Sequence, residues 1–264
     1  MGFAAFLNRL FRRPPRYDYE AEEKRLAAYY EAHPEEREAI LAKRSWKPTI
    51  LIDSPAAAPA SRSKLGGLPE LPEGWEIPHS PEGNPMALLL QLDCAALPPG
   101  HGLPERGMLY FFLDADSTQW NWGLEAEDCA YWSVLYTELP PRQPEIGSSA
   151  PDFREVPVSF RLGRSWYTEE DETGIETDEN PDGHRLLGYP FELQSGQAMA
   201  ADCSELAGAP PDTEWELLLQ LDTDDDANGP GWMWGDMGML FFWIRRDDLA
   251  ARRFDRVRMM LECY

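Results

Sequence analysis

Two identical apolar runs, both LLLQLD, dominate the hydrophobic pattern of the chain, at residues 88–93 and 217–222. Each is followed by a run that begins Gly-Met-Leu and continues with two aromatic residues, starting at Gly107 and at Gly238. Short runs rich in Leu, Phe, Tyr, Val and Ile, bounded by Pro, Gly and Asp, are typical of strands. Because LLLQLD is apolar on both faces, each copy predicts a central strand that is covered on both sides.

The match between the two halves of the chain extends to other words in the same order, which indicates an internal duplication. The matched words are a short apolar run (residues 49–52 and 156–162), a turn-like word (KLGGLP at 64–69 and RLLGYP at 185–190) and a closing mixed run (133–139 and 257–263). We therefore predict an α+β fold with a largely antiparallel or mixed sheet. It is built from two four-strand halves, residues 47–140 and 154–264.

The first 46 residues have a different pattern. Residues 1–16 form a basic amphipathic segment, in which the apolar residues of 1–13 share one helical face flanked by arginines. Such a helix can lie in a membrane interface, but an acidic protein is repelled by anionic lipid. A helix docked on its own protein, or a frayed tail, is therefore favoured over membrane contact. Residues 17–46 predict one or two helices divided at Pro34.

Charge narrows the range of partners. The whole chain has a net charge of −23; residues 1–48 hold 10 basic and 8 acidic side chains, so the remainder carries −25. A surface of that sign disfavours nucleic acid and attracts a basic protein, a cationic ligand or a metal. We expect no nucleic-acid partner.

Features that report on the compartment favour the cytoplasm. The four cysteines are too scattered for a CxxC metal site and too few for a secreted disulfide framework. No apolar run reaches the roughly 18 residues of a transmembrane helix, and the N-terminus lacks the cleavage site of a signal peptide. No pattern in the chain specifies an oligomeric state.

Each LLLQLD strand contains one polar residue, Gln91 or Gln220. A buried amide without partners costs roughly 1–3 kcal/mol, so each glutamine should find hydrogen-bond partners, including the option of each other across a pseudo-twofold axis. A structural role is favoured over ligand binding. Lys64 and Arg185, which open the two turn-like words, join the glutamines as candidate binding residues.

The densest acidic stretch follows the second LLLQLD run. Asp224 to Gly229 matches the start of a calcium loop, D-x-D-x-N-G, so Asp222, Asp224, Asp226 and Asn228 are candidate metal ligands. The twelfth position, however, is Gly235, where a calcium loop needs a bidentate Glu. An acidic hairpin loop without a metal is the favoured interpretation, and Ca²⁺ is the one cofactor that the sequence suggests.

Two paired-tryptophan words, at residues 120–122 and 232–234, stand on opposite sides of their Gly-Met-Leu runs and are therefore not repeat equivalents. Paired aromatics can bind sugars or proline-rich peptides, although tryptophan more often caps a core. Gly235 between Trp234 and Asp236 indicates a forced turn, in which Asp236 either caps the turn or faces a ligand.

Common catalytic motifs are missing from the sequence. The four histidines show no HExxH or HxH spacing. Residues 61–64 satisfy S-x-x-K, but the accompanying SDN and KTG words are absent, and no G-x-S-x-G occurs. Enzymatic activity therefore has no specific support.

Taken together, the words SKLGGLPELPEGW, PMALLLQLD, GLPERGMLYFF, RLLGYP, LLLQLDTDDD and MWGDMGMLFFWI resemble the YwqG-like family of bacterial proteins of unknown function. The resemblance covers roughly residues 47–264. It implies an α+β, largely sheet fold and a bacterial cytosolic setting, and it supplies no activity, substrate or cofactor.

Two functional hypotheses follow. The first is a non-catalytic binding protein whose acidic face engages a basic protein or peptide, in the manner of acidic immunity proteins. The alternative is a small-molecule or divalent-metal site at the junction of the two halves, with Asp222, Asp224, Asp226 and Asp236 as ligands and Trp234 as a wall.

Overall fold

The structure is a computed structural model. It describes residues 25, 28–42, 45–54, 60–115, 123, 125–142, 152–167, 183–194 and 199–263. The chain divides into two compact units: one includes helix α3 (Pro34–Leu41), and the other holds the strands. The basic segment 1–16 and the tryptophans at 120 and 122 lie outside the described residues. In the part that is described, no helix is long and apolar enough to cross a membrane.

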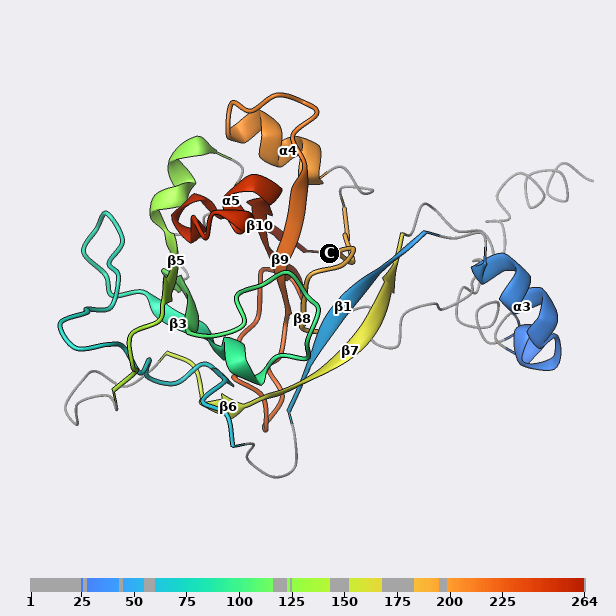
Figure 1. Cartoon of the computed structure of the whole chain (residues 1–264), viewed down its shortest axis with the longest axis horizontal. Helices are drawn as coiled ribbons and strands as arrows, with labels where there is room; N and C mark the ends of the chain where they lie inside the picture. Colours follow the sequence, from blue (N-terminus) through green and yellow to red (C-terminus); the bar gives the residue numbers. More distant parts are fainter. Residues whose placement is uncertain are drawn as a thin grey trace, which may run out of the picture. The chain divides into compact units, whose positions relative to one another are not determined.

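The strand-bearing unit consists of two sheets, and every described strand pairing is antiparallel (Figure 1). One sheet has the order β11-β10-β9-β8-β1-β7, formed by β1 (Trp46–Asp53), β7 (Ser159–Trp166), β8 (Arg185–Leu186), β9 (Trp215–Asp222), β10 (Met239–Arg245) and β11 (Arg258–Glu262). The other has the order β5-β4-β3-β2-β6, formed by β2 (Lys64–Leu65), β3 (Ala87–Asp93), β4 (Met108–Leu113), β5 (Trp132–Thr137) and β6 (Val156–Pro157). The predicted α+β class is confirmed.

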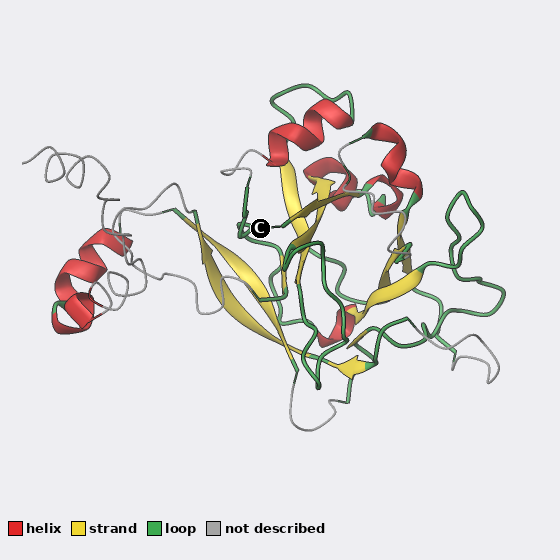
Figure 2. Ribbon diagram, turned by 180° about the vertical axis from the view of Figure 1, so that it is seen from behind, coloured by secondary structure: helices red, strands yellow, loops and turns green. Residues whose placement is uncertain are grey.

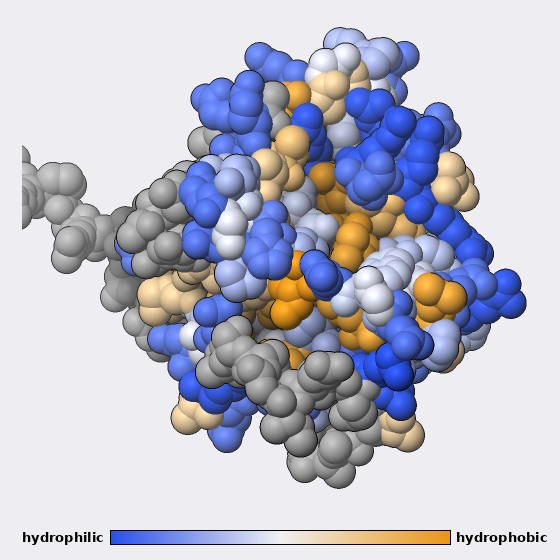
Figure 3. Space-filling view, turned by 90° about the vertical axis from the view of Figure 1, so that its left-hand side faces the viewer, coloured by the Kyte–Doolittle hydropathy of each residue, from blue (hydrophilic) through white to orange (hydrophobic). Residues whose placement is uncertain are grey.

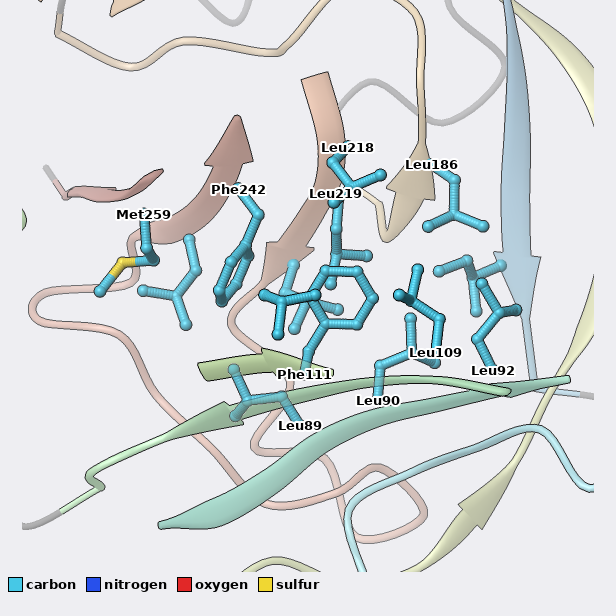
Figure 4. Packing of buried hydrophobic residues seen from close by; sticks show 14 of the residues in the cluster. Leu89, Leu90, Leu92, Leu109, Phe111, Leu186, Leu218, Leu219, Phe242 and Met259 are labelled. Carbon is cyan, nitrogen blue, oxygen red and sulfur yellow. The ribbon is translucent and has the colours of Figure 1, made fainter. Parts of the chain in front are cut away.

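The two LLLQLD runs form β3 and β9, which lie inside their sheets as predicted. Side chains from β3 and β4 meet side chains from β9 and β10 in a shared core between the sheets (Figure 4). The opposite face of each sheet is covered as well. Leu88 packs with Met86 and Phe112 on one sheet, and Leu217 packs with residues of helix α4 (Met199–Leu206) on the other.

Both central strands carry a β-bulge at the same place in LLLQLD. The pairing register shifts between Leu88 and Leu90 against β4, and β9 shifts in the same way between Leu217 and Leu219 against β10. A bulge lets two residues of one strand oppose one residue of its partner. Consecutive leucines, Leu89 with Leu90 and Leu218 with Leu219, therefore both belong to the shared core.

The first strand of each predicted half pairs with the other half. Strand β1, from residues 47–140, pairs with β8 and β7, whereas β6, from residues 154–264, pairs with β2. When β1, β6 and β7 are left out, the remaining strands of the two sheets, β2 to β5 and β8 to β11, have the same order. That order is what a duplication would produce, and the duplication itself stays a prediction.

The turn-like words adopt matching backbone conformations. Gly66 and Gly67 have φ of 58° and 72°, and Leu187 and Gly188 have φ of 61° and 87°. A Cβ at Gly66 would lie 2.2 Å from the carbonyl oxygen of Arg154. Glycine is therefore required at residue 66 both by the left-handed backbone and by the close approach of another segment.

Two short helices of the second half, α4 and α5 (Arg246–Ala250), come between strands in the sequence and were not predicted (Figure 2). Met199 and Cys203 of α4 are four residues apart, so they face the same side. Both are fully buried against Trp215 and Phe241 of the sheet.

Candidate functional site

The two buried glutamines bind backbone groups. Gln91 accepts from the Glu70 N–H at 2.8 Å and donates to the Arg62 carbonyl at 2.8 Å. Gln220 accepts from the Phe191 N–H at 2.9 Å and donates to the Gly183 carbonyl at 3.0 Å. These contacts account for the burial of both amides without requiring a bond between the two glutamines, and they support the structural interpretation.

Lys64 and Arg185 occupy matching positions beside those glutamines. Lys64 pairs with Gln91 across β2 and β3, and Arg185 pairs with Gln220 across β8 and β9. Both are buried, and the Lys64 ammonium donates to the Leu68 carbonyl at 2.7 Å and to Glu155 at 2.6 Å. These cations lie within the sheets and do not line the cavity described below.

The stretch predicted as a calcium loop forms a hairpin. The Asp224 N–H donates to the Trp232 carbonyl at 3.0 Å, and its carbonyl accepts from Gly231 and Trp232. A Cβ at Gly229 would lie 1.8 Å from a carboxylate oxygen of Asp224. The glycine of the D-x-D-x-N-G word therefore leaves room for the carboxylate of the first aspartate, which a larger residue would displace.

Positively charged and imidazole groups of the protein face this hairpin. The Arg154 guanidinium donates to the carbonyls of Gly229 at 2.9 Å and Asp226 at 2.5 Å. His184 accepts from the Asp222 N–H through Nδ1 at 3.0 Å, and its Nε2 lies 3.6 Å from the Asp224 carboxylate. The nearby His184 imidazole is the largest cause that lowers the pKa of Asp224, although burial acts in the opposite direction.

The predicted metal ligands do not converge. Asp226, Asn228 and Asp236 are exposed, and Asp236 stands in a turn after Trp234. Within the described ranges, no three His, Cys, Asp or Glu side chains form a group that could hold a metal ion. Calcium binding stays a prediction, which a melting experiment below addresses.

Trp232 and Trp234 form an aromatic cluster with Phe153. Both indole N–H groups donate to the Asp222 carbonyl, at 2.8 and 3.2 Å, and the two ring centroids are 5.3 Å apart. Phe153 meets both indoles edge to face. Residues two apart in an extended segment point the same way, so both tryptophans are buried while Met233 between them is 44% exposed.

A cavity of about 120 Å³ lies against this cluster. Its walls come from both sheets and from the hairpin: Leu113, Asp114, Ala115, Tyr131, Phe153, Gly231, Trp232, Met233, Trp234, Leu240, Met259 and Leu261. Gly231 and Met233 are exposed, so the cavity reaches the surface. Figure 3 shows that one face of the molecule has a hollow with apolar side chains, surrounded by hydrophilic ones.

Carboxylates gather at the Tyr131 side of this cavity. The Tyr131 hydroxyl donates to Glu82 at 2.7 Å. That hydrogen bond is the largest cause that raises the pKa of Tyr131, followed by burial and by the negative charges of Glu82, Asp114 and Asp128. Asp114 is 7% exposed and accepts from Asn84 at 3.4 Å. The cavity therefore combines aromatic walls with negative charge.

Of the residues singled out from the sequence, Trp234 lines the cavity, and Asp222 positions both tryptophans through its carbonyl oxygen. Asp114, Tyr131 and Phe153 were missed. Asp114 does follow directly on the predicted strand GMLYFFL, and a carboxylate at a strand end was the available signal. Tyr131 and Phe153 carry no such signal, because tertiary pairing alone brings them to the site.

Comparison with known proteins gives a family and no described function. None of the curated proteins searched matches the chain. The model of one protein family, the domain of unknown function DUF1963, matches residues 63–263, which include all of the cavity-lining residues. With most of its length matched, the chain belongs to the DUF1963 family.

Proposed function

We propose that this protein is a non-catalytic binding protein whose partner is a basic protein or peptide. The observation that carries the proposal is charge: residues 49–264 hold 39 acidic and 14 basic side chains. Exposed carboxylates add to this surface: Glu82, which accepts from the Tyr131 hydroxyl, and Glu125 and Glu127 in the segment that precedes Tyr131 in the sequence. A field of one sign steers oppositely charged partners and raises their association rates.

The resemblance of the sequence to YwqG-like proteins is compatible with this role, since it brings no catalytic residues with it. A bacterial, cytoplasmic protein that neutralises a basic partner, as an acidic immunity protein does, is the form of the proposal that fits the resemblance.

The test is a pull-down from the native host at low ionic strength, followed by quantitative binding of each recovered protein over a range of salt concentrations. We expect a basic partner whose affinity falls steeply with salt, because exposed charges are screened beyond a Debye length of about 8–10 Å near physiological salt. A screen that recovers no basic partner, or only partners insensitive to salt, contradicts the proposal.

The cavity favours a second candidate, a small-molecule site at the junction of the two halves. It lies beside the Asp222–Asp236 loop, and Trp234 is one of its walls.

For the metal-dependent version, the melting temperature of the wild type is measured with and without calcium, magnesium, manganese and zinc. The same measurements are made on Asp224→Asn/Asp226→Asn. A ligand at about 100 times its Kd adds roughly 2.7 kcal/mol to stability, so a shift that the double variant loses would assign a metal to the hairpin.

A further inference from the structure

We infer that the cavity beside Trp232 and Trp234 holds a lysine or arginine side chain of the basic partner. The aliphatic stem would lie against the indole rings, and the charged group would lie between Asp114 and Tyr131. This inference rests on the proposed function and adds to it the point at which the partner is anchored.

The size and walls of the cavity suit such a side chain. An apolar cavity of about 150 Å³ binds benzene, so a volume of about 120 Å³ accepts a short chain of a few heavy atoms. Trp232, Trp234 and Phe153 present rings around this space, and cations bind the faces of aromatic rings, tryptophan best of all. Alkyl stems of basic residues also pack well on apolar surfaces.

The charge of the cavity selects a cation. Asp114 lines the wall and is almost buried. An ammonium or guanidinium in the cavity would bring an opposite charge close to this carboxylate, whereas an uncharged occupant would bring none. An anion would be repelled by Asp114 and also by Glu82 and Asp128, which act on the neighbouring Tyr131.

Tyr131 adds a hydrogen-bond acceptor. Its hydroxyl proton is directed to Glu82, so the lone pairs of the oxygen can accept from a cationic donor. The Arg154 guanidinium lies close to Gly231 in the cavity wall, since it would be 3.1 Å from a Cβ built on that glycine. It donates to the carbonyls of Asp226 and Gly229, which anchor it to the hairpin.

The first experiment titrates the full-length protein with side-chain analogues and follows the indole N–H signals by NMR. The probes are butylammonium for lysine, propylguanidinium for arginine, 1-pentanol as a neutral compound of similar size and pentanoate as an anion. We expect the signals of Trp232 and Trp234, assigned with single Trp→Phe variants, to shift with the cations, less with the alcohol and not with pentanoate.

The second experiment measures the affinity of the basic partner and of the analogues for three variants. Asp114→Asn should weaken cation binding at least about 10-fold, or ~1.4 kcal/mol, and leave 1-pentanol binding unchanged. Asp212→Asn removes the same charge from an exposed position outside the cavity and should have little effect. Ala115→Leu fills the cavity without changing charge and should abolish binding of cations and alcohol alike. Thermal melts confirm that each variant is folded.

The outcomes separate this inference from the proposed function. If a basic partner binds in a salt-sensitive manner but Asp114→Asn and Ala115→Leu bind it normally, the anchoring inference is wrong and the proposed function stands. If the analogues bind in the cavity but no basic partner exists, the site serves a free organic cation and both proposals are overturned. Loss of partner affinity in both cavity variants, with Asp212→Asn unchanged, supports the inference.

Discussion

At the scale of single residues, the backbone at Gly66 imposes a strong constraint. Its φ of 58° is unfavourable for other residues, and a Cβ would lie 2.2 Å from the Arg154 carbonyl oxygen. We therefore predict that Gly66→Ala lowers the free energy of unfolding by more than ~2 kcal/mol, measured by urea denaturation. A left-handed backbone alone costs an alanine about 1–2 kcal/mol.

Gly83→Ala is the matched control for that variant. Gly83 has φ of 88°, and nothing lies within 4 Å of a Cβ built there. Gly83→Ala should therefore lower the free energy of unfolding only by the cost of placing an alanine in a left-handed backbone. If the two variants lost the same free energy of unfolding, the close approach of Arg154 to Gly66 would not contribute to the cost of the substitution.

The Asp224–His184 contact predicts a dependence of stability on pH. The pKa of Asp224 is lowered in the folded protein. The contact therefore contributes fully above the unfolded value of about 3.9, and its contribution is lost as the pH falls through the lowered folded value. Urea denaturation over this range should show a steeper acid loss for the wild type than for Asp224→Asn. The neighbouring, exposed Asp225→Asn serves as the control, and a wild-type slope shared by both variants would contradict the prediction.

At the scale of elements, the bulge in LLLQLD decides which leucines are most costly to remove. Leu218 stands at the bulge of β9 and is fully buried between the sheets. We expect Leu218→Ala to lower the free energy of unfolding by ~2–5 kcal/mol, as other buried leucines do. Leu162 on edge strand β7 is 56% exposed, so Leu162→Ala should change it by no more than about 0.5 kcal/mol. Similar effects at the two leucines would place Leu218 outside the core.

Elements were predictable where the chain itself carries the pattern. The LLLQLD and Gly-Met-Leu runs predicted β3, β4, β9 and β10, because an apolar run bounded by breakers has few alternatives. Neither the bulges nor α4 could be predicted this way. A continuously apolar run has no period from which a register shift could be inferred, and the eight residues of α4 owe their place to packing against the sheet.

The candidate site was predictable only in part, for a related reason. Trp234 and the Asp222 loop stand out in the sequence, but the cavity needs Asp114 and Tyr131, which the antiparallel pairing of β4 with β5 brings to the same edge. The D-x-D-x-N-G sequence also fits a loop whose carbonyl groups bind an arginine: Arg154, from a distant segment, donates to two carbonyls of that loop. Local sequence specifies a loop and leaves its tertiary partners open.

At the scale of the whole molecule, the exchange of first strands makes the halves interdependent. Strand β1 lies between β8 and β7, so residues 154–264 alone would lack the strand that joins them. The shared core would also lose one of its two faces, exposing the LLLQLD leucines to water at roughly 25 cal/mol for each Å². We therefore predict that fragments 45–142 and 152–263 are each unfolded by circular dichroism and in thermal melts.

Mixing the two fragments should restore the fold, because every strand pairing between the halves can form between two chains as well as within one. An equimolar mixture is expected to gain strand signal and a cooperative melt whose midpoint rises with concentration, as for any bimolecular assembly. Leu218→Ala in the second fragment should weaken that assembly, whereas Leu162→Ala should not. A cooperative melt of either fragment alone would contradict the prediction. It would mean that one half has a sufficient core and folds without the strands of the other half that pair with it.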